Sequence, residues 1–327
     1  MFSIVLCHII NRYTMIPAHE VLPLIFNCGV FMFLMISGYL FGTKQVTAFK
    51  SWFIKRITTV MIPAVLLSVI FIVVLFFYGE KTTIPTIVAY CADLEGLLFL
   101  NWNLANKLFH EISGLGHLWF TTIIMLCYCM VPLFQKYCKP VQEKKQFRKA
   151  SALLVVAAIV IFFVSKYIML WYFFSFFIGY FAGKNNWLKK VNGKAIAIAT
   201  GVSAIIVIGR VFSKMYWEAS SYYQVYSVLF QMTIGMYSVL LISFLSNKFP
   251  KISETIGENK VINFLDKYSY YVYLCHGVLC LGTFNVYEKF SMLQATGVFL
   301  IGTILLTAAL GFVCETLKKP IMARITK

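Results

Sequence analysis

Two histidines lie within long apolar runs of the sequence. His8 falls in the run that opens the chain, and His276 falls in the run 268–284. An ionisable side chain at membrane depth is costly, so by default it marks a functional site. A neutral imidazole takes a proton from a hydroxyl near neutral pH, as acyl transfer to an alcohol requires. For His8 a structural hydrogen bond to a neighbouring helix is an equal alternative, and for His276 alone the structural role is favoured.

A basic residue and a proline form a second candidate site. Arg56 directly precedes an apolar run, at a depth where a guanidinium can bind a phosphate through two hydrogen bonds. Pro63 is predicted to interrupt the helix there and to free a carbonyl. The nearby Lys50 and Lys55 are better explained as signals of membrane orientation.

The other three histidines carry weaker signals. His117 begins an apolar run within Gly116-His117-Leu118-Trp119-Phe120, where a histidine in the interfacial aromatic belt is the simpler interpretation. His19 and His110 lie in predicted loops without a distinguishing context.

The composition places these residues in a membrane protein. The 327 residues are 60% hydrophobic and only 13% charged, whereas soluble domains carry about 25% charged residues. The net charge of +17 comes from short basic clusters between apolar runs, which argues against nucleic-acid binding. The nine cysteines form no CxxC pair and indicate no metal site.

Ten apolar segments are long enough, or nearly so, to cross a bilayer, which takes about 20 residues. We therefore expect an all-α integral membrane protein with about ten transmembrane helices. The predicted spans are 1–14, 22–43, 57–78, 117–135, 150–165, 167–183, 195–213, 224–246, 268–284 and 293–314. The fifth and sixth spans are nearly fused and are predicted to form a tight helical hairpin.

The distribution of charge supports this topology independently. Alternate loops, including the C-terminal tail, hold 22 Lys and Arg residues, and the remaining loops hold 7. Because cytoplasmic loops collect basic residues, both termini are predicted to be cytoplasmic. The first span is short and is expected to be truncated at its N-terminus. We expect residues 1–327 to form a single membrane domain.

The acidic residues also discriminate between functions. None of the 12 Asp and Glu residues lies centrally in a predicted span, which argues against a proton-coupled transporter. The first outside loop holds one acid, Glu20, so no acidic pair is expected there to bind a metal.

Five sequence pieces together resemble the membrane-bound acyltransferase-3 family of bacterial O-acyltransferases. In order along the chain, they are His8, Phe31-Met32-Phe33-Leu34-Met35-Ile36-Ser37-Gly38-Tyr39, Phe53-Ile54-Lys55-Arg56 leading to Pro63, His117-Leu118-Trp119-Phe120, and Ser269 through His276. Each piece is weak alone, but their order on a ten-span frame makes the resemblance fairly specific.

The resemblance implies transfer of an acetyl or other short acyl group from acetyl-CoA or another acyl-CoA, with no tightly bound cofactor and no metal. The acceptor would be a hydroxyl of a cell-envelope polysaccharide or its lipid-linked precursor, at the bacterial inner membrane. His8 and Arg56 would be catalytic. The resemblance makes the following residues substrate-binding candidates: Ser37, His117, Trp119, Ser269, Tyr273 and His276. Outer aromatic residues such as Trp102, Tyr216 and Trp217 are candidates to stack on sugar rings, although an interfacial belt explains them more simply.

Two features depart from the family pattern. Members usually carry an arginine about three turns before the first-span histidine, which this sequence does not contain. A second arginine commonly follows the position of Arg56 by three residues, where this chain has Thr59. Two alternatives therefore stay open: a transporter or flippase of a glycolipid or anionic solute, and a family member with only a binding role.

Overall fold

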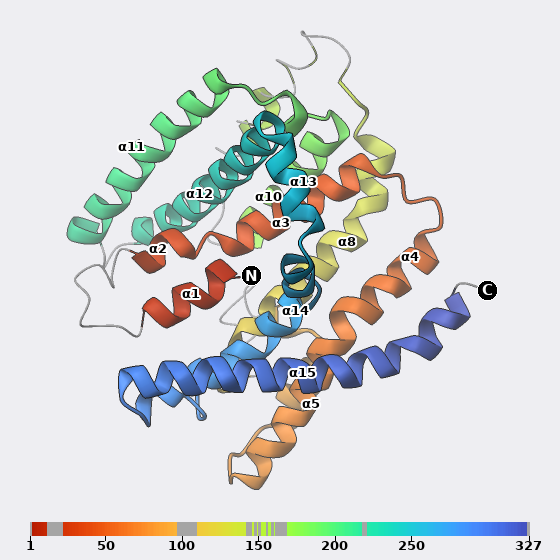
Figure 1. The fold of residues 1–327 in the computed structure, drawn as a ribbon, viewed down its shortest axis with the longest axis vertical. Helices are drawn as coiled ribbons and strands as arrows, with labels where there is room; N and C mark the ends of the chain where they lie inside the picture. Colours follow the sequence, from red (N-terminus) through yellow and green to blue (C-terminus); the bar gives the residue numbers. More distant parts are fainter. Residues whose placement is uncertain are drawn as a thin grey trace. The chain divides into compact units, whose positions relative to one another are not determined.

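The computed structural model describes residues 2–11, 22–96, 110–141, 169–217 and 221–325, together with scattered residues between 146 and 160. Within these residues the regular structure is entirely helical (Figure 1). In the part of the chain that the structure describes, five helices are long and apolar enough to cross a membrane. They cover Phe49–Phe77, Gly116–Tyr137, Gly193–Tyr216, Tyr226–Lys248 and Met292–Ala323.

The chain divides into two compact units, each assembled from distant parts of the sequence. The first unit holds residues 1–23, 47–129 and 260–327, and the second holds 24–46 and 130–259. The main elements of the first unit are α1 (Phe2–Ile10), α4 (Phe49–Arg56), the π-helical segment η1 (Ile57–Met61), α5 (Ile62–Phe77), α6 (Ile84–Cys91), η3 (Gly116–Leu118), the first part of α8 (Trp119–Tyr137), α14 (Lys260–Cys280), η5 (Val286–Glu288) and α15 (Met292–Ile325). The second unit holds α3 (Gly29–Thr43), α10 (Met169–Lys184), η4 (Leu188–Lys190), α11 (Gly193–Trp217), α12 (Ser221–Lys248), α13 (Pro250–Glu258) and the rest of α8, and α2 (Leu22–Phe26) spans the boundary between the units.

Several helices extend beyond the apolar runs that predicted them. Most of the predicted span 268–284 belongs to α14, which begins at Lys260 and ends at Cys280, and the span 293–314 belongs to α15, which continues to Ile325. A helix is not obliged to stop where the apolar run stops, because its backbone hydrogen bonds continue into the polar flanking residues. The span 22–43 is instead divided between α2 and α3 by a turn at residues 27–28.

The predicted helical hairpin is only partly described. Its second member corresponds to α10, whereas most of the span 150–165 lies outside the described residues. Helix α1 is a helix of nine residues that ends at Ile10, shorter than the predicted span 1–14.

Glycines allow α3 and α10 to pack closely within the second unit. A Cβ atom added to Gly38 would overlap the carbonyl oxygen of Phe176, and one added to Gly179 would overlap that of Met35. Small residues permit such approach of helix backbones, as predicted for the end of the second span. Ser37 is buried on α3 beside this contact.

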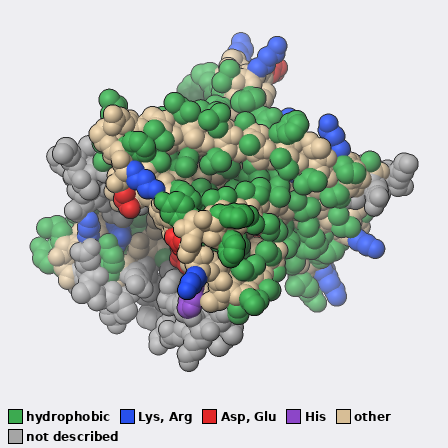
Figure 2. All heavy atoms as spheres, turned by 90° about the horizontal axis from the view of Figure 1, so that it is seen from below, with side chains coloured by type: hydrophobic (Ala, Val, Ile, Leu, Met, Phe, Trp, Pro, Cys, Tyr) green, Lys and Arg blue, Asp and Glu red, His purple; other side chains and the backbone are tan. Residues whose placement is uncertain are grey.

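The membrane character is visible on the surface. On the face drawn in Figure 2, most of the coloured surface side chains are hydrophobic, and most Lys and Arg side chains lie near the edges. The exposed apolar side chains include Phe76, Ile205, Ile304 and Phe312. Together with the five long apolar helices, this surface identifies a multi-pass membrane protein.

Candidate active site

One face of α14 organises the interior of the first unit. Tyr270, Tyr273, His276 and Gly277 are spaced three or four residues apart, so their side chains project from the same side of the helix. The Tyr270 hydroxyl donates to the carbonyl oxygen of Val60 at 2.7 Å. The Tyr273 hydroxyl donates to the carbonyl oxygen of His117. This face therefore ties α14 to the π-helical segment η1 and to the start of α8.

Three of the five histidines meet on this face. The ring centroids of His8 and His276 are 5.3 Å apart, and those of His117 and His276 are 5.0 Å apart. His276 is completely buried, His117 is buried and His8 is half-buried. Helix α1 packs against α14, and Val5 joins a core cluster with Cys280 and Phe299, which fixes the position of His8.

Backbone carbonyls fix the tautomers of two of these rings. Nδ1 of His276 lies 2.5 Å from the carbonyl oxygen of Tyr273, and Nε2 of His117 lies 2.9 Å from that of Leu274. A carbonyl oxygen only accepts hydrogen bonds, so both of these ring nitrogens carry the proton. In the neutral rings the lone pairs are then on Nε2 of His276 and Nδ1 of His117. Neither atom has a hydrogen-bond partner in the described part of the chain. Each is available as a proton acceptor.

A glycine makes room for His117. A Cβ atom at Gly277 would overlap the Nδ1 and Cε1 atoms of the His117 ring. Any larger residue at position 277 would therefore push the ring away from His276. For His117 the simpler prediction was a place in the interfacial aromatic belt. In the structure its ring is instead buried against α14 and contacts the His276 ring.

Arg56 lies at the irregular point that the sequence predicted. It ends α4 directly before η1, and Pro63 follows within the first turn of α5. Proline lacks the N–H that would complete the helix ladder, which accounts for the π-helical segment before it. The break predicted near Pro63 is confirmed. The Arg56 side chain is half-buried, with its guanidinium carbon 5.9 Å from the centre of the Trp52 ring.

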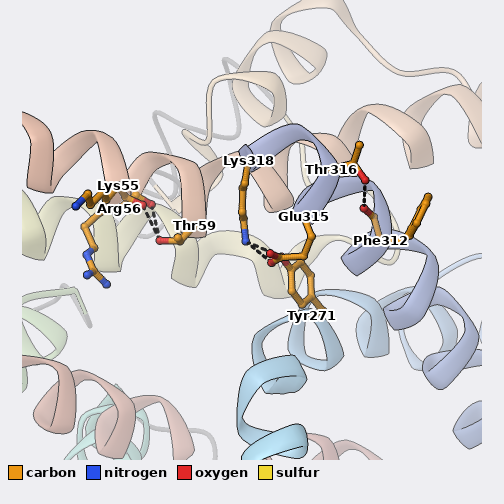
Figure 3. A network of polar contacts seen from close by, with 8 residues as sticks. All are labelled: Lys55, Arg56, Thr59, Tyr271, Phe312, Glu315, Thr316 and Lys318. Carbon is orange, nitrogen blue, oxygen red and sulfur yellow. Dashed lines mark hydrogen bonds and ion pairs between the residues drawn. The ribbon is translucent and has the colours of Figure 1, made fainter. Parts of the chain in front are cut away.

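Thr59 supplies no charge to this region. Its hydroxyl donates to the carbonyl oxygen of Lys55 at 2.8 Å (Figure 3). A threonine hydroxyl often makes this bond to its own helix. The position where the family resemblance predicts a second arginine is therefore occupied by a side chain turned back onto the backbone.

The structure describes some of the remaining predicted residues, and the others lie outside the described residues. Trp119 begins α8 with a half-buried ring next to Phe120. The Ser269 hydroxyl donates to the carbonyl oxygen of Asp266 at 2.8 Å. His110 is exposed. Residues His19 and Trp102 and the side chain of Trp217 lie outside the described residues.

The sequence analysis missed a buried pair of carboxyl groups, Asp93 and Glu95. They follow α6 in a segment predicted to be an outside loop, yet they are only 4% and 2% exposed. Asp93 adopts a left-handed backbone conformation with φ of 55°. The Thr122 hydroxyl donates to the Asp93 carbonyl at 2.8 Å and accepts from the Gly96 N–H at 3.0 Å, which anchors the turn on α8. The signal was Asp93-Leu94-Glu95 within an otherwise apolar stretch.

Burial shifts both carboxyl groups toward their protonated forms. Burial raises the pKa of Asp93 to about 7. Burial, and then the neighbouring Asp93 carboxyl, raise the pKa of Glu95 well above its usual value. The Thr121 hydroxyl contacts both the Asp93 carboxyl and the Leu118 carbonyl, at 2.7 Å for the latter, but has one proton to donate. A proton on Asp93 satisfies both contacts.

The described residues contain no group of three or more His, Cys, Asp or Glu side chains placed to hold a metal ion. Two rings of the histidine cluster donate to backbone carbonyl oxygens through one nitrogen each.

A family model described as an acyltransferase domain, the acyltransferase 3 domain, matches residues 1–315. The chain belongs to the acyltransferase 3 family. This membership implies acyltransferase activity by a protein of the membrane. No curated protein and no solved structure matches the chain significantly.

Proposed function

We propose that this acyltransferase moves an acetyl or other short acyl group from acyl-CoA to a hydroxyl of a cell-envelope polysaccharide or of its lipid-linked precursor. The observation that carries the proposal is the meeting of His8, His117 and His276, two of them with lone pairs fixed by backbone hydrogen bonds. The proposed setting is the bacterial inner membrane, with ten crossings and both termini cytoplasmic. The whole chain would act as one membrane domain.

In the proposed reaction His8 acts as general base. It takes the proton of the acceptor hydroxyl while the hydroxyl oxygen attacks the thioester carbonyl carbon. The carbon–sulfur bond then breaks, and the sulfur receives the proton from His8. Because one proton is taken and returned, the reaction needs no net proton acceptor. A transient acyl group on His8 is the covalent variant of this scheme.

His276 is proposed to position and stabilise His8. When His8 is protonated, both of its ring nitrogens carry protons, and only one of them faces the substrate. The Nε2 lone pair of His276 can accept a hydrogen bond from the other protonated nitrogen of His8 once the two rings move slightly closer. Catalytic hydrogen bonds often shorten in this way when substrate binds. His117 would support this arrangement through its bond to the Leu274 carbonyl, and Tyr273 through its bond to the His117 carbonyl.

Arg56 is proposed to bind the phosphate groups of the acyl donor. Its guanidinium lies at a helix irregularity next to the segment 44–56, which holds 4 basic residues. A guanidinium binds phosphate oxygens in a two-point geometry that lysine cannot reproduce. Ser37, Trp119 and Ser269 stay proposed substrate contacts, and Tyr216 a proposed sugar-stacking residue.

The decisive experiment compares His8→Ala with wild type at matched protein levels, with glycan O-acetylation as the readout. Loss of a general base lowers the rate about 10²–10⁴-fold. His110→Ala is the matched control, because His110 is exposed, whereas the cluster histidines are buried or half-buried. Unchanged acetylation in His8→Ala would remove His8 from catalysis and return the cluster to a structural role.

One observation supports the transport alternative. The predicted spans lack central carboxyl groups, and this absence argued against a transporter. Asp93 and Glu95 provide a buried pair of carboxyl groups outside those spans. A transporter or flippase predicts movement of an unmodified substrate in vesicles without acyl-CoA. An acyltransferase predicts that product formation stops completely when acyl-CoA is omitted.

A further inference from the structure

The second face of α14 borders a groove that shares one residue, Ser269, with the proposed substrate contacts. The groove lies between α14 and α15 within the first unit and has a volume of about 520 Å³. Most of its lining is apolar, and four of the lining side chains are large, hydrophobic and exposed. These four are Phe264, Leu265, Ile304 and Phe312. Such a cluster of exposed apolar side chains indicates contact with lipid or with a partner.

The lining changes character along the length of the groove. From Ile304 to Lys319 the groove follows 15 residues of α15, about 22 Å at 1.5 Å per residue. Val272 and Ile304 line the apolar end, and Lys267 and Lys319 line the other end, on the side predicted to be cytoplasmic. One leaflet of a bilayer core is about 15 Å thick. The groove is therefore long enough to hold an acyl chain with its headgroup at the lysines.

The basic end keeps a net positive charge. Glu315, the acidic lining residue, is engaged by its neighbours (Figure 3). Its Oε1 accepts from Lys318 Nζ at 3.1 Å and from the Tyr271 hydroxyl at 3.0 Å. The charge of Lys318, which does not line the groove, offsets that of Glu315. Lys267 and Lys319 line the groove and are exposed.

We propose that this groove binds an anionic phospholipid. Its phosphate would lie between Lys267 and Lys319, and one acyl chain would run past Val272, Ala308 and Ile304. A neutral lipid would fill the apolar part equally well but would leave the two ammonium groups without an anion. Lipid binding here needs neither His8 nor Arg56, and its test does not depend on acyl transfer.

The test measures lipid retention by the purified full-length chain, using native mass spectrometry. The probes are phosphatidylglycerol and phosphatidylcholine with identical acyl chains. Wild type is expected to retain phosphatidylglycerol preferentially. Each lysine near an anionic lipid contributes roughly fivefold in affinity, so Lys267→Gln/Lys319→Gln should lose about 25-fold of the preference. The matched control is Lys251→Gln/Lys260→Gln, which removes two exposed lysines of the same side outside the groove.

A second variant tests the apolar part without altering charge. Ala308 lines the groove and is exposed, so Ala308→Phe should fill it and reduce retention of both lipids. Leu305→Phe is its control, because Leu305 is 64% exposed on the same helix but does not line the groove. Equal retention of the two lipids by wild type would overturn the proposal. So would an unchanged preference in the double lysine variant, or displacement of the lipid by acyl-CoA at equal concentration.

Discussion

The α3–α10 helix pair and the histidine-bearing face of α14 are held in opposite ways. In the pair, the contact depends on what is missing, since Gly38 and Gly179 have no side chains and the two backbones touch. On α14, the contact depends on what is present, because Tyr270, Tyr273 and His276 each reach a backbone carbonyl. An added side-chain atom is expected to disrupt the helix pair, and loss of a polar atom is expected to weaken the contacts of α14.

This difference separates stability from chemistry. Helix association in membranes relies on close packing of small residues, so the α3–α10 contact is expected to determine folding. The polar contacts of α14 orient the rings of the histidine cluster, so they are expected to determine activity. Substitutions in the two regions should therefore have different readouts.

The largest expected effect is on activity. His276→Gln replaces the imidazole, whose centre lies 5.3 Å from that of His8, by an amide that is a far weaker proton acceptor, so acyl transfer should fall at least 10²-fold. The measurement is the initial rate of glycan acetylation at equal amounts of folded protein. His110→Gln, an exposed histidine, should retain the wild-type rate. A wild-type rate in His276→Gln would show that the cluster does not serve catalysis.

The next effect is on stability. Gly38→Val places new atoms against the Phe176 carbonyl, which should cost about 1–3 kcal/mol or more in folding free energy. Thermal unfolding in detergent, with the rate per folded molecule, separates this loss from chemistry. Gly201→Ala on α11 is the control, because a Cβ atom there meets nothing within 4 Å. It should be neutral or stabilising, since alanine favours a helix over glycine. An unaffected melting temperature in Gly38→Val would show that the helices can separate without cost.

A smaller effect is expected where both roles meet. Tyr273→Phe removes the hydrogen bond to the His117 carbonyl and keeps the ring. The loss of this bond should cost about 1 kcal/mol in folding free energy. If this bond orients the cluster, the rate should drop several-fold while the melting temperature changes little. A change in melting temperature with an unchanged rate would assign Tyr273 to folding alone.

The last effect concerns pH. Because the folded-state pKa of Asp93 is raised to about 7 from an ordinary value of 3.8, the folded chain binds the extra proton between these values. The stability from this group is therefore full below about pH 4 and is lost as pH rises through 7. The melting temperature of wild type should therefore fall between pH 5 and pH 7.5. In Asp93→Asn this fall should be smaller by a few degrees. Part of the decline should remain, because the raised pKa of Glu95 acts in the same direction. An identical pH profile in Asp93→Asn would mean that the carboxyl group is ionised in the folded chain.

The sequence alone predicted the features that depend on local pattern. Long apolar runs predicted the helical membrane fold, because about 20 apolar residues in a row have no comparable role in a soluble domain. The stretch Ser37-Gly38-Tyr39 predicted close helix packing, and Pro63 predicted an interruption next to Arg56, which the structure shows as η1. His8 and His276 were recognised as candidates because a charge in an apolar run is conspicuous.

The tertiary structure alone decided which of these residues meet. Positions 8, 117 and 276 are separated by more than a hundred residues each, and no periodicity specifies contact over such distances. It also showed that Asp93 and Glu95 are interior, because burial depends on how a loop folds back against α8 rather than on the residues beside it. Sequence thus determined that the chain forms apolar helices carrying a few ionisable groups. The packing of those helices determined which groups share one environment, because proximity is a property of the folded chain.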